Sequence, residues 1–578
     1  MRIGIERSDR AACENYEHSN SLVIVALFLT AFALRAVGAD YGYFHGDEPI
    51  NAAARVLSGE LSPGQHFYPP LVNYLHAVGF AFLFLIGLIL DWWDGVSGFR
   101  GQYFDDPTVF YVTARLLTAA IGAMTAPLFY LIARRLGLVP WAALLVGLGG
   151  AFFPLSVFMS HIAKGDVALA TSFVAVIWAI IARLDTGKPG KWDIWIAVFV
   201  VLAVSFKHSS AIILGPLSVG VVALIARSEG VTALTRSLLR FLATIALIWP
   251  VLNIGVLLDF ASFLEFQRIQ SVMSVRMDQG VAPGLITFLQ RAQDPILGLN
   301  PVHAFIAAVF PAILAIRSCK LRHKPVLLVV WGALVIGSVA IAAMSGTRQP
   351  EHLWIANFAG FYCLSFLALM ALIVGSAGVQ RAAVAVVWAF GFIEIVIGAV
   401  IPIQQALAIP VRDLTDAYIA EELADEMILT MVDIGLPQRR EAQDMQLARW
   451  HRLADRYDVE MPELAEERLI RENEPNSVFY LAMPTVMYGL EGVDEDSVEF
   501  EVQPHAWPPQ REEWELDYWL DQGFRIFLVS NLEYHVHEIE SQLMRTFFED
   551  LVERCSIEAH FDPTKPLFLE REVAILRC

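Results

Sequence analysis

Residues 44–74 of the chain read FHGDEPINAAARVLSGELSPGQHFYPPLVNY. The stretch follows an apolar segment, 21–37, and opens with two adjacent carboxylates, Asp47 and Glu48. A Gly/Ser/Pro-rich break and an aromatic Pro pair then lead into a second apolar segment, 71–90. Because membrane helices need about 20 apolar residues, this pattern predicts that the two carboxylates lie at a membrane surface.

The composition predicts a membrane body followed by a water-soluble domain. Of the 578 residues, 56% are hydrophobic and only 17% are charged, and the mean hydropathy is +0.53. These values are typical of a polytopic α-helical membrane protein. Residues 411–578 hold 38 acidic and 15 basic side chains, a net charge of −23, whereas residues 1–410 carry +4. We therefore expect a membrane domain at 21–410 and an acidic domain at 411–578, whose charge argues against nucleic acid as a partner.

Eleven apolar segments are expected to span the membrane. They are residues 21–37, 109–133, 141–158, 167–182, 194–206, 210–226, 241–258, 302–316, 326–344, 353–374 and 382–401. With residues 1–20 in the cytoplasm, this order places most Lys and Arg side chains of the membrane body in cytoplasmic loops, as the positive-inside rule requires. The first outer loop then runs from 38 to 108, and the C-terminal domain lies outside.

The segment 71–90 is itself apolar enough to cross, so two topologies are open. If it crosses, the Arg134-Arg135 pair falls on the outer face, against the positive-inside rule. If it lies along the outer surface, the pair falls in the cytoplasm. We favour the surface placement, because a proline pair opens the segment and the Trp92-Trp93 pair closes it.

The spacing of apolar residues in 411–578 predicts a small α/β domain. The expected helices are 414–432, 441–457 and 538–555, and the expected strands are 477–481, 525–529 and 572–576. The five cysteines show no metal-binding spacing. A disulfide between Cys555 and Cys578 is open in an oxidising compartment, but we expect two unpaired thiols.

The predicted outer face collects most of the ionisable side chains near span ends. Besides the two acids of the first loop, it holds His66, Tyr68, Arg115, His161, Lys164, Asp166, Lys207, His208, Arg348 and His352. A charge costs little near the interface, where long basic side chains reach water, so each residue taken singly fits a plain anchoring role. Their gathering on one face favours a functional site there.

Several short motifs follow one another in the order of a known family. Asp47-Glu48 followed by Tyr68-Pro69-Pro70-Leu71 resembles the first outer loop of glycosyltransferase family 39. That family includes protein O-mannosyltransferases and the aminoarabinose transferases of lipid A, has the GT-C membrane fold, and places a juxtamembrane helix where this chain has 71–90. The later matches are Ala114-Arg115-Leu116, Ser160–Asp166, Ser205-Phe206-Lys207, and Gly523–Ser530 with Tyr534, whereas 346–350 matches only in part.

The resemblance implies inverting transfer of a sugar from a polyprenyl-phosphate or polyprenyl-diphosphate carrier to a glycan, lipid or protein acceptor. An attacking hydroxyl must lose its proton to a nearby carboxylate, and Asp47 is the expected general base. Glu48 and Asp166 are the other candidate catalytic residues, and Glu48 is expected to orient the acceptor or to support Asp47. Fixed cations stabilise the phosphate leaving group, and the candidates are Arg115, Lys207 and Arg348. The candidate substrate-binding residues are His66, Tyr68, His161 and Lys164.

No cofactor follows with certainty from these residues. Asp166 is open to binding the acceptor, orienting a lysine, pairing with Lys164, or holding a divalent cation (Mg²⁺ or Mn²⁺) together with Asp47. No metal-ligand spacing decides between these roles.

Two other classes of function fit part of the pattern. A multi-span transporter is the main alternative, although transporters tend to place ionisable groups at the membrane midplane within repeated halves, and no repeat is evident here. A receptor anchored by eleven spans is the weaker one. Because eukaryotic-type lumenal inserts are absent, the bacterial plasma membrane is the expected location.

Overall fold

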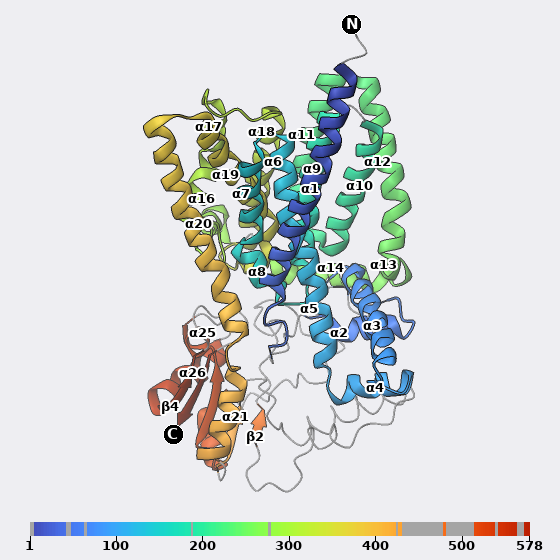
Figure 1. Ribbon diagram of the computed structural model, residues 1–578. Helices are drawn as coiled ribbons and strands as arrows, with labels where there is room; N and C mark the ends of the chain where they lie inside the picture. The colour runs from blue at the N-terminus through green and yellow to red at the C-terminus, as the bar shows by residue number, and fades with distance from the viewer. Residues whose placement is uncertain are drawn as a thin grey trace. The chain divides into compact units, whose positions relative to one another are not determined.

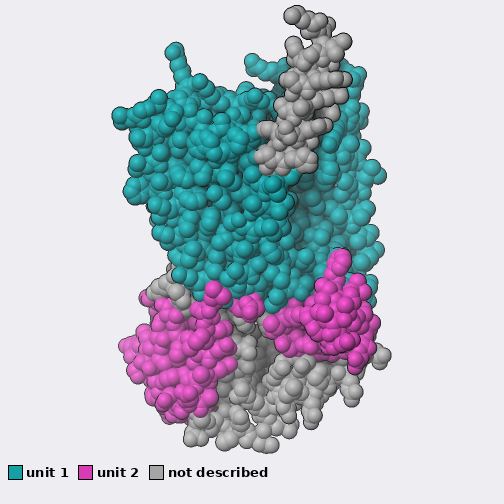
Figure 2. Space-filling view, viewed as in Figure 1, with its two compact units in different colours: residues 1–39, 45–81, 111–406 teal, residues 40–44, 82–110, 407–578 magenta. Residues whose placement is uncertain are grey.

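The computed structural model describes residues 5–41, 48–62, 66, 68–186, 189–275, 279–423, 426–430, 478–480, 514–537, 542–562 and 572–578. The chain divides into two compact units (Figure 2). The first comprises residues 1–39, 45–81 and 111–406, and the second comprises 40–44, 82–110 and 407–578. In the described residues the first unit is helical, and the second carries a five-stranded sheet.

Long apolar helices make up the membrane part of the chain (Figure 1). Nine stretches of the described residues are long and apolar enough to cross a membrane. They are α3 (Leu71–Ile89), α5 with α6 (Thr108–Ala123 and Thr125–Arg135), α9 (Asp166–Thr186), α10 (Pro189–Phe206), η1 with α11 (His208–Ser210 and Ala211–Glu229), α12 (Val231–Leu252), α18 (Lys324–Ser345), α19 (Ile355–Gly375) and α20 (Gly378–Ala406). The polytopic α-helical membrane fold is thereby confirmed.

Three further predicted spans are present in shorter or broken form. The first lies within α1 (Ile5–Ala36), whose apolar part is Ser21–Ala36. The span at 141–158 is bent by 46° between α7 (Pro140–Ala151) and α8 (Pro154–Ser160), because a proline disfavours helical geometry in the residue before it. The span at 302–316 divides into α16 (Asn300–Ala308) and α17 (Phe310–Ala315), where Pro311 interrupts the helical hydrogen bonds.

The remaining helices of the described residues are shorter connecting elements. They are α2 (Ile50–Leu57), α4 (Val96–Asp105), α13 (Ile254–Leu258), α14 (Phe260–Ser274), α15 (Val281–Gln293), η3 (Glu351–Leu353) and α21 (Val411–Glu422). The α12–α13 break falls at Asn253, so the predicted span 241–258 is not one continuous helix.

The first half of α3 packs beside the N-terminal part of α5. A Cβ on Gly79 would come within 2.3 Å of Leu117 Cδ1 and 3.5 Å of Thr113 Cγ2, so the two helices lie in close contact there. Further along α5, Thr171 of α9 donates a hydrogen bond to Ile121 O at 3.2 Å. The α3 contact therefore precedes the point where α5 meets α9. This arrangement suits a helix at the bundle end, and the surface placement of 71–90 stays a prediction.

The centre of the bundle is formed by α9 and α19, which pack against each other and are the most buried of the candidate spans. Glycines allow close approach: a Cβ on Gly360 of α19 would come within 2.7 Å of Leu334 Cδ2 and 3.1 Å of Phe173 Cε1. Helix α9 is buried along most of its length, and its first residue, Asp166, is buried at one end of the bundle. We call this end the Asp166 end.

The C-terminal region forms an α/β sheet of order β2-β1-β3-β5-β4. The strands are β1 (Ile428–Thr430), β2 (Val478–Tyr480), β3 (Ile526–Ser530), β4 (Ser556–Phe561) and β5 (Val573–Arg577), and the helices that follow α21 in the described residues are α24 (Leu516–Asp521), α25 (Leu532–His537) and α26 (Gln542–Arg554). Strand β1 is parallel to β2 and β3, whereas β5 is antiparallel to β3 and β4. Separate apolar clusters contain Leu429 and Ile428, neighbours whose side chains point to opposite faces.

The sequence predictions for this domain are partly right. Strands were expected at the positions of β2, β3 and β5, and a helix at that of α26. The expected helix 414–432 is wrong in its second half, because residues 428–430 are a central strand paired on both sides. The predicted helix 441–457 lies outside the described residues.

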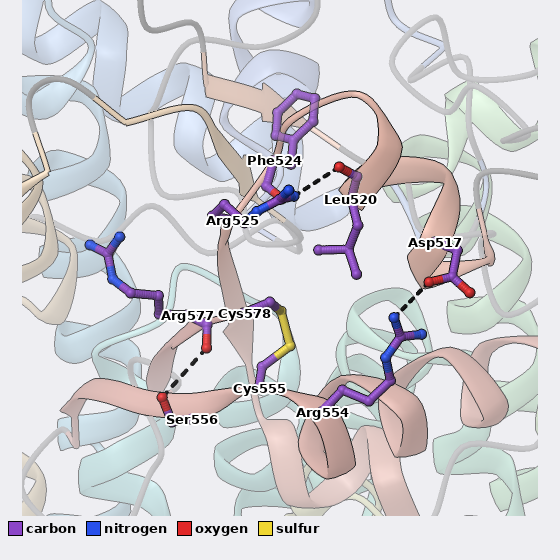
Figure 3. The surroundings of a disulfide bond; sticks show 9 residues. All are labelled: Asp517, Leu520, Phe524, Arg525, Arg554, Cys555, Ser556, Arg577 and Cys578. Carbon is purple, nitrogen blue, oxygen red and sulfur yellow. Dashed lines mark hydrogen bonds and ion pairs between the residues drawn. A yellow bond between two sulfur atoms is a disulfide. The ribbon is translucent and has the colours of Figure 1, made fainter.

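The expectation of unpaired thiols at the C-terminus is also wrong. Cys555 and Cys578 form a disulfide (Figure 3). The reason lies in the β4–β5 register: Ser556 pairs with Arg577, which brings the two flanking residues together. Because β4 was not predicted, this proximity was invisible in the sequence. Closing a loop of this size stabilises a fold by about 3 kcal/mol in the chain-entropy model.

Candidate functional site

The loop between α8 and α9 contains or contacts several of the candidate residues. It begins at His161, which is fully buried, with Nδ1 2.9 Å from Val157 O and Nε2 2.9 Å from Val37 O. Both ring nitrogens therefore face main-chain carbonyls, one of them at the end of α1. These contacts make His161 an anchor for the loop and leave neither nitrogen directed at a substrate.

Glu48 and Arg115 form a buried two-point ion pair beside this loop. Arg115 Nε donates to Glu48 Oε1 and Nη2 donates to Oε2, both at 2.8 Å. Glu48 Oε1 also accepts from Ala163 N at 2.8 Å, and Arg115 Nη1 donates to Ala39 O at 3.1 Å. The pair ties the start of α2, the α5 helix and the α8–α9 loop together. Glu48 is thus an anchoring group, and its charge offsets that of Arg115, which was predicted to bind phosphate.

Asp166 and Lys207 form the second ion pair of the loop. Gly165 permits it, because a Cβ at this position would lie 2.7 Å from Phe206 O, a contact that no side chain tolerates. Lys207 Nζ lies 2.5 Å from Asp166 Oδ1. The other oxygen, Asp166 Oδ2, is buried and has no hydrogen-bond partner in the described part of the chain. A buried acceptor without a donor is costly, so this oxygen is available for a ligand.

Lys164 brings a second cation to the same place. Its Nζ lies 5.6 Å from the centre of the Tyr68 ring, within cation–π range. Lys164 also acts electrostatically on Asp166, as does His352 of η3. Lys207 contacts this carboxylate directly, and Lys164 and His352 act on it electrostatically. We call these four residues the lysine cluster (Lys164, Asp166, Lys207 and His352).

Arg348 is not brought into this cluster by any contact of the described residues. Its side chain is exposed, and its main-chain N–H donates to Ser345 O at 3.2 Å. The next residue, Gln349, is buried instead and donates to Gly284 O at 2.7 Å. His352, which the sequence placed on this face without a role, is the member of this segment that acts electrostatically on Asp166.

His66 has a partner that the sequence did not suggest. Its Nε2 lies 3.1 Å from Asp259 Oδ2, although 193 residues separate the two. Hydrogen bonds from Ser262, His66 and Ser62 lower the pKa of Asp259 below its ordinary value of 3.8, against an opposing effect of burial. Asp259 directly precedes α14 but its side chain makes no capping hydrogen bond with that helix, and no sequence signal connected it with His66.

Asp47, the predicted general base, lies outside the described residues. Within the described ranges, no group of three or more His, Cys, Asp or Glu side chains could hold a metal ion. Asp166 is paired with a lysine, and that positive charge opposes a cation at the same carboxylate. The Mg²⁺ or Mn²⁺ site suggested for Asp47 and Asp166 therefore stays a prediction without support from the described residues.

Comparison with known proteins gives matches among solved structures alone. No family model matches the chain, and no curated protein does. The fold is similar to that of ArnT from Cupriavidus metallidurans bound to undecaprenyl phosphate, with a TM-score of 0.47 and 14% identity over 96% of this chain and 97% of that one. It is also similar to the Archaeoglobus fulgidus oligosaccharyltransferase AglB in complex with an inhibitory peptide and a dolichol-phosphate (TM-score 0.44, 12% identity, 77% of this chain and 69% of that one).

A third similar structure is the S. cerevisiae protein O-mannosyltransferase Pmt1-Pmt2 complex bound to the sugar donor. Its TM-score is 0.34 and its identity 18%, over 42% of this chain and 34% of that one. All three are glycosyltransferases of the GT-C superfamily, the superfamily that the motifs of this chain resemble. At these identities and TM-scores the likeness assigns no donor, acceptor or mechanism, and the proposal below is argued from the residues of this chain.

Proposed function

We propose that the chain is a membrane glycosyltransferase that moves a sugar from a polyprenyl-phosphate carrier to an acceptor hydroxyl at the Asp166 end. The observation that carries the proposal is the lysine cluster, in which Lys207 contacts the buried carboxylate of Asp166 and Lys164, two residues earlier in the chain, lies against the Tyr68 ring. Such a cluster suits a phosphate better than a neutral sugar, because lysine binds phosphate as a point charge.

The position of the cluster suits a substrate with a lipid tail. Asp166 is the first residue of a membrane-length helix and Lys207 follows the last residue of another. A polyprenyl chain would remain in the bilayer while its phosphate reaches these lysines at the interface. Tyr68, beside Lys164, offers an aromatic face for the sugar ring.

The reaction proceeds by one displacement. The acceptor hydroxyl gives its proton to the carboxylate of Asp47, and its oxygen forms a bond to the anomeric carbon. The bond from that carbon to the phosphate oxygen breaks, and the electron pair leaves with polyprenyl phosphate. Lys164 and Lys207 stabilise the charge that develops on the phosphate, and attack opposite the leaving group inverts the anomeric centre.

Glu48 has a different task from its neighbour in this mechanism. Its carboxylate accepts three hydrogen bonds, two from Arg115 and one from Ala163 N. An acid so fully occupied is poorly placed to take a proton from an acceptor. Glu48 therefore fixes the chain next to Asp47, and the two acids of the motif divide the roles of anchor and base.

We place the protein in the bacterial plasma membrane with the C-terminal domain outside. The Cys555–Cys578 disulfide supports this orientation, because disulfides persist in oxidising compartments and are rare in the cytosol. The sequence of charges along the spans supports the same orientation.

The test is sugar transfer by the purified protein in lipid nanodiscs. A panel of radiolabelled polyprenyl-phosphate hexoses and pentoses is offered with lipid, glycan and peptide acceptors, and Asp47→Asn serves as the paired variant. We expect a transfer product with the wild type and a loss of about 10³-fold with Asp47→Asn. No product from any donor, together with substrate flux across proteoliposomes that Asp47→Asn leaves unchanged, would support a transporter instead.

A further inference from the structure

The loop that carries His66 and Tyr68 is held by a carboxylate at the start of α14. Asp259 Oδ2 accepts hydrogen bonds from His66 Nε2 at 3.1 Å and from Ser62 Oγ at 3.2 Å. A carboxylate is an acceptor alone when ionised, so Nε2 of the histidine carries the hydrogen. We call these three residues the Asp259 clamp. The His66 side chain is only 1% exposed, which leaves little room for it to face a sugar.

A second attachment fixes the same loop just before the clamp. Tyr74 Oη donates to Leu61 O at 2.8 Å and accepts from Gly255 N at 2.9 Å. A Cβ on Gly255 would lie 2.4 Å from Leu61 O, so the two backbones touch. The loop is therefore bound to the α13–α14 region both by its main chain and by the clamp.

The clamp adjoins residues of the proposed site on two sides. His66 precedes by two residues Tyr68, whose ring lies against Lys164. The ring of Phe263 in α14 packs edge-on against His66, at 6.0 Å between centres, and also contacts the ring of His208 at 5.4 Å. His208 directly follows Lys207. Phe263 thus contacts His66, two residues before Tyr68, and His208, the residue after Lys207.

We infer that Asp259 is a positioning residue that acts through His66 to hold Tyr68 beside Lys164 in the transferase site. The inference deepens the proposed function and rests on it for the meaning of the lysine cluster. It also changes the role of His66, which was a candidate substrate-binding residue. In this arrangement His66 transmits position and does not touch the sugar.

The first test separates substrate binding from the chemical step. In Asp259→Ala the clamp is lost, and we expect the KM for the polyprenyl-phosphate sugar to rise about tenfold with little change in kcat. Asp259→Asn keeps an oxygen that accepts from Nε2 and restores most of the affinity. The matched control is Glu265→Ala, an exposed acid on the same helix. A KM for Asp259→Ala equal to that of the control would overturn the inference.

The second test asks whether His66 acts through Asp259 or on the substrate. If it acts through Asp259, the double variant His66→Ala/Asp259→Ala has the same KM as Asp259→Ala alone. If the double variant loses the product of the two single effects, His66 contacts the substrate directly and the inference is wrong. Thermal unfolding in detergent, required to agree with the wild type, shows that each variant is folded.

The third test needs no activity, so it separates failure of the clamp from failure of the proposed function. In Tyr68→Cys protein, maleimide labelling of residue 68 is measured by mass spectrometry with and without Asp259→Ala. We expect at least a fivefold increase in labelling rate with Asp259→Ala and none with Glu265→Ala. Increased labelling supports the clamp, and if the wild-type protein, whose Tyr68 is intact, transfers no sugar, the proposed function is refuted while the clamp stands. Unchanged labelling in an active protein refutes the clamp.

Discussion

The two ends of α9 carry charged groups that are satisfied in opposite ways. At its C-terminal end, Arg183 donates to Asp193 at 2.7 Å, to Glu229 and to Ser237. Asp193 is in turn completed by Ser237 and Arg240. At the N-terminal end, Asp166 has one oxygen on Lys207 and the other buried without a partner among the described residues.

The difference separates a structural network from a candidate site. The Arg183 end joins α9, α10, the end of α11 and α12 by hydrogen bonds that occupy both oxygens of its buried carboxylate, as a stable buried ion pair requires. At the Asp166 end one buried carboxylate oxygen has no donor among the described residues, which is a cost to the fold. Unmatched groups of this kind concentrate where a ligand completes them, and this contrast supports the assignment of function to one end.

The largest effect expected in this comparison comes from removing both members of the Asp166–Lys207 ion pair. Asp166→Asn/Lys207→Met leaves neither member of the pair as a lone charge, so we expect thermal stability to be kept or slightly raised. Sugar transfer should fall by at least about 10²-fold, because a phosphate-stabilising cation is lost. Transfer assays and detergent unfolding on the same preparations check both halves. Loss of stability with retained transfer would show that the Asp166–Lys207 pair serves the fold and not the reaction.

The next effect concerns the opposite end of the helix. Arg183→Met leaves Asp193 with Ser237 and Arg240 alone, and we expect a loss of about 3 kcal/mol in the free energy of unfolding. Transfer per folded molecule should stay unchanged. The measurement is urea or detergent unfolding combined with activity corrected for the folded fraction. A drop in corrected activity like that at the Asp166 end would show that both ends serve the reaction.

A weaker effect is expected at the edge of the site. Asp259 has a lowered pKa, so the folded state is favoured above the unfolded value near 3.8, and this contribution is lost as the pH falls through the lower folded value. Because the Asp259 side chain is 31% exposed and solvent screens its interactions, the contribution is less than about 1 kcal/mol. When the free energy of unfolding is measured between pH 6 and pH 2, it should decrease less steeply with falling pH in Asp259→Asn than in the wild type. The same pH dependence in both proteins would mean that the Asp259 hydrogen bonds do not favour the folded state.

The smallest effect sharpens the boundary of the cluster. Arg348 is exposed and makes no side-chain contact with the described site residues, so Arg348→Ala should change transfer by less than about twofold. The paired variant is Lys164→Ala, which removes a member of the cluster and should reduce transfer much more. Equal losses in the two variants would extend the phosphate site to Arg348.

The fold class was predictable because membrane helices follow from apolar length alone. Breaks within the spans were harder: Pro154 and Pro311 divide helices that hydropathy joins into one segment. In the C-terminal domain, residues 428–430 were read as helix, because their strand state depends on pairing with residues 478–480 and 526–528. The spacing of apolar residues within one segment does not show which distant segment it pairs with.

The candidate site residues could be selected from the sequence, but the residues that they contact could not. Lys207 and Asp166 were both candidates. The role of Gly165 in their contact depends on its closeness to Phe206 O, which the sequence does not show. The pairing of His66 with Asp259 joins segments 193 residues apart, and the sequence offered no reason to connect them. Glu48 was expected to orient the acceptor or to support Asp47, and its three hydrogen bonds to Arg115 and Ala163 N could not be read from the motif.

The most direct measurement is the affinity of undecaprenyl phosphate for the nanodisc-embedded wild type, Lys207→Met and Arg183→Met, compared at equal folded fraction. If the Asp166 end is the phosphate site, Lys207→Met weakens binding by at least about tenfold, a 1.4 kcal/mol loss, and Arg183→Met binds like the wild type. Equal affinity in all three proteins, or weaker binding in Arg183→Met alone, would contradict the account.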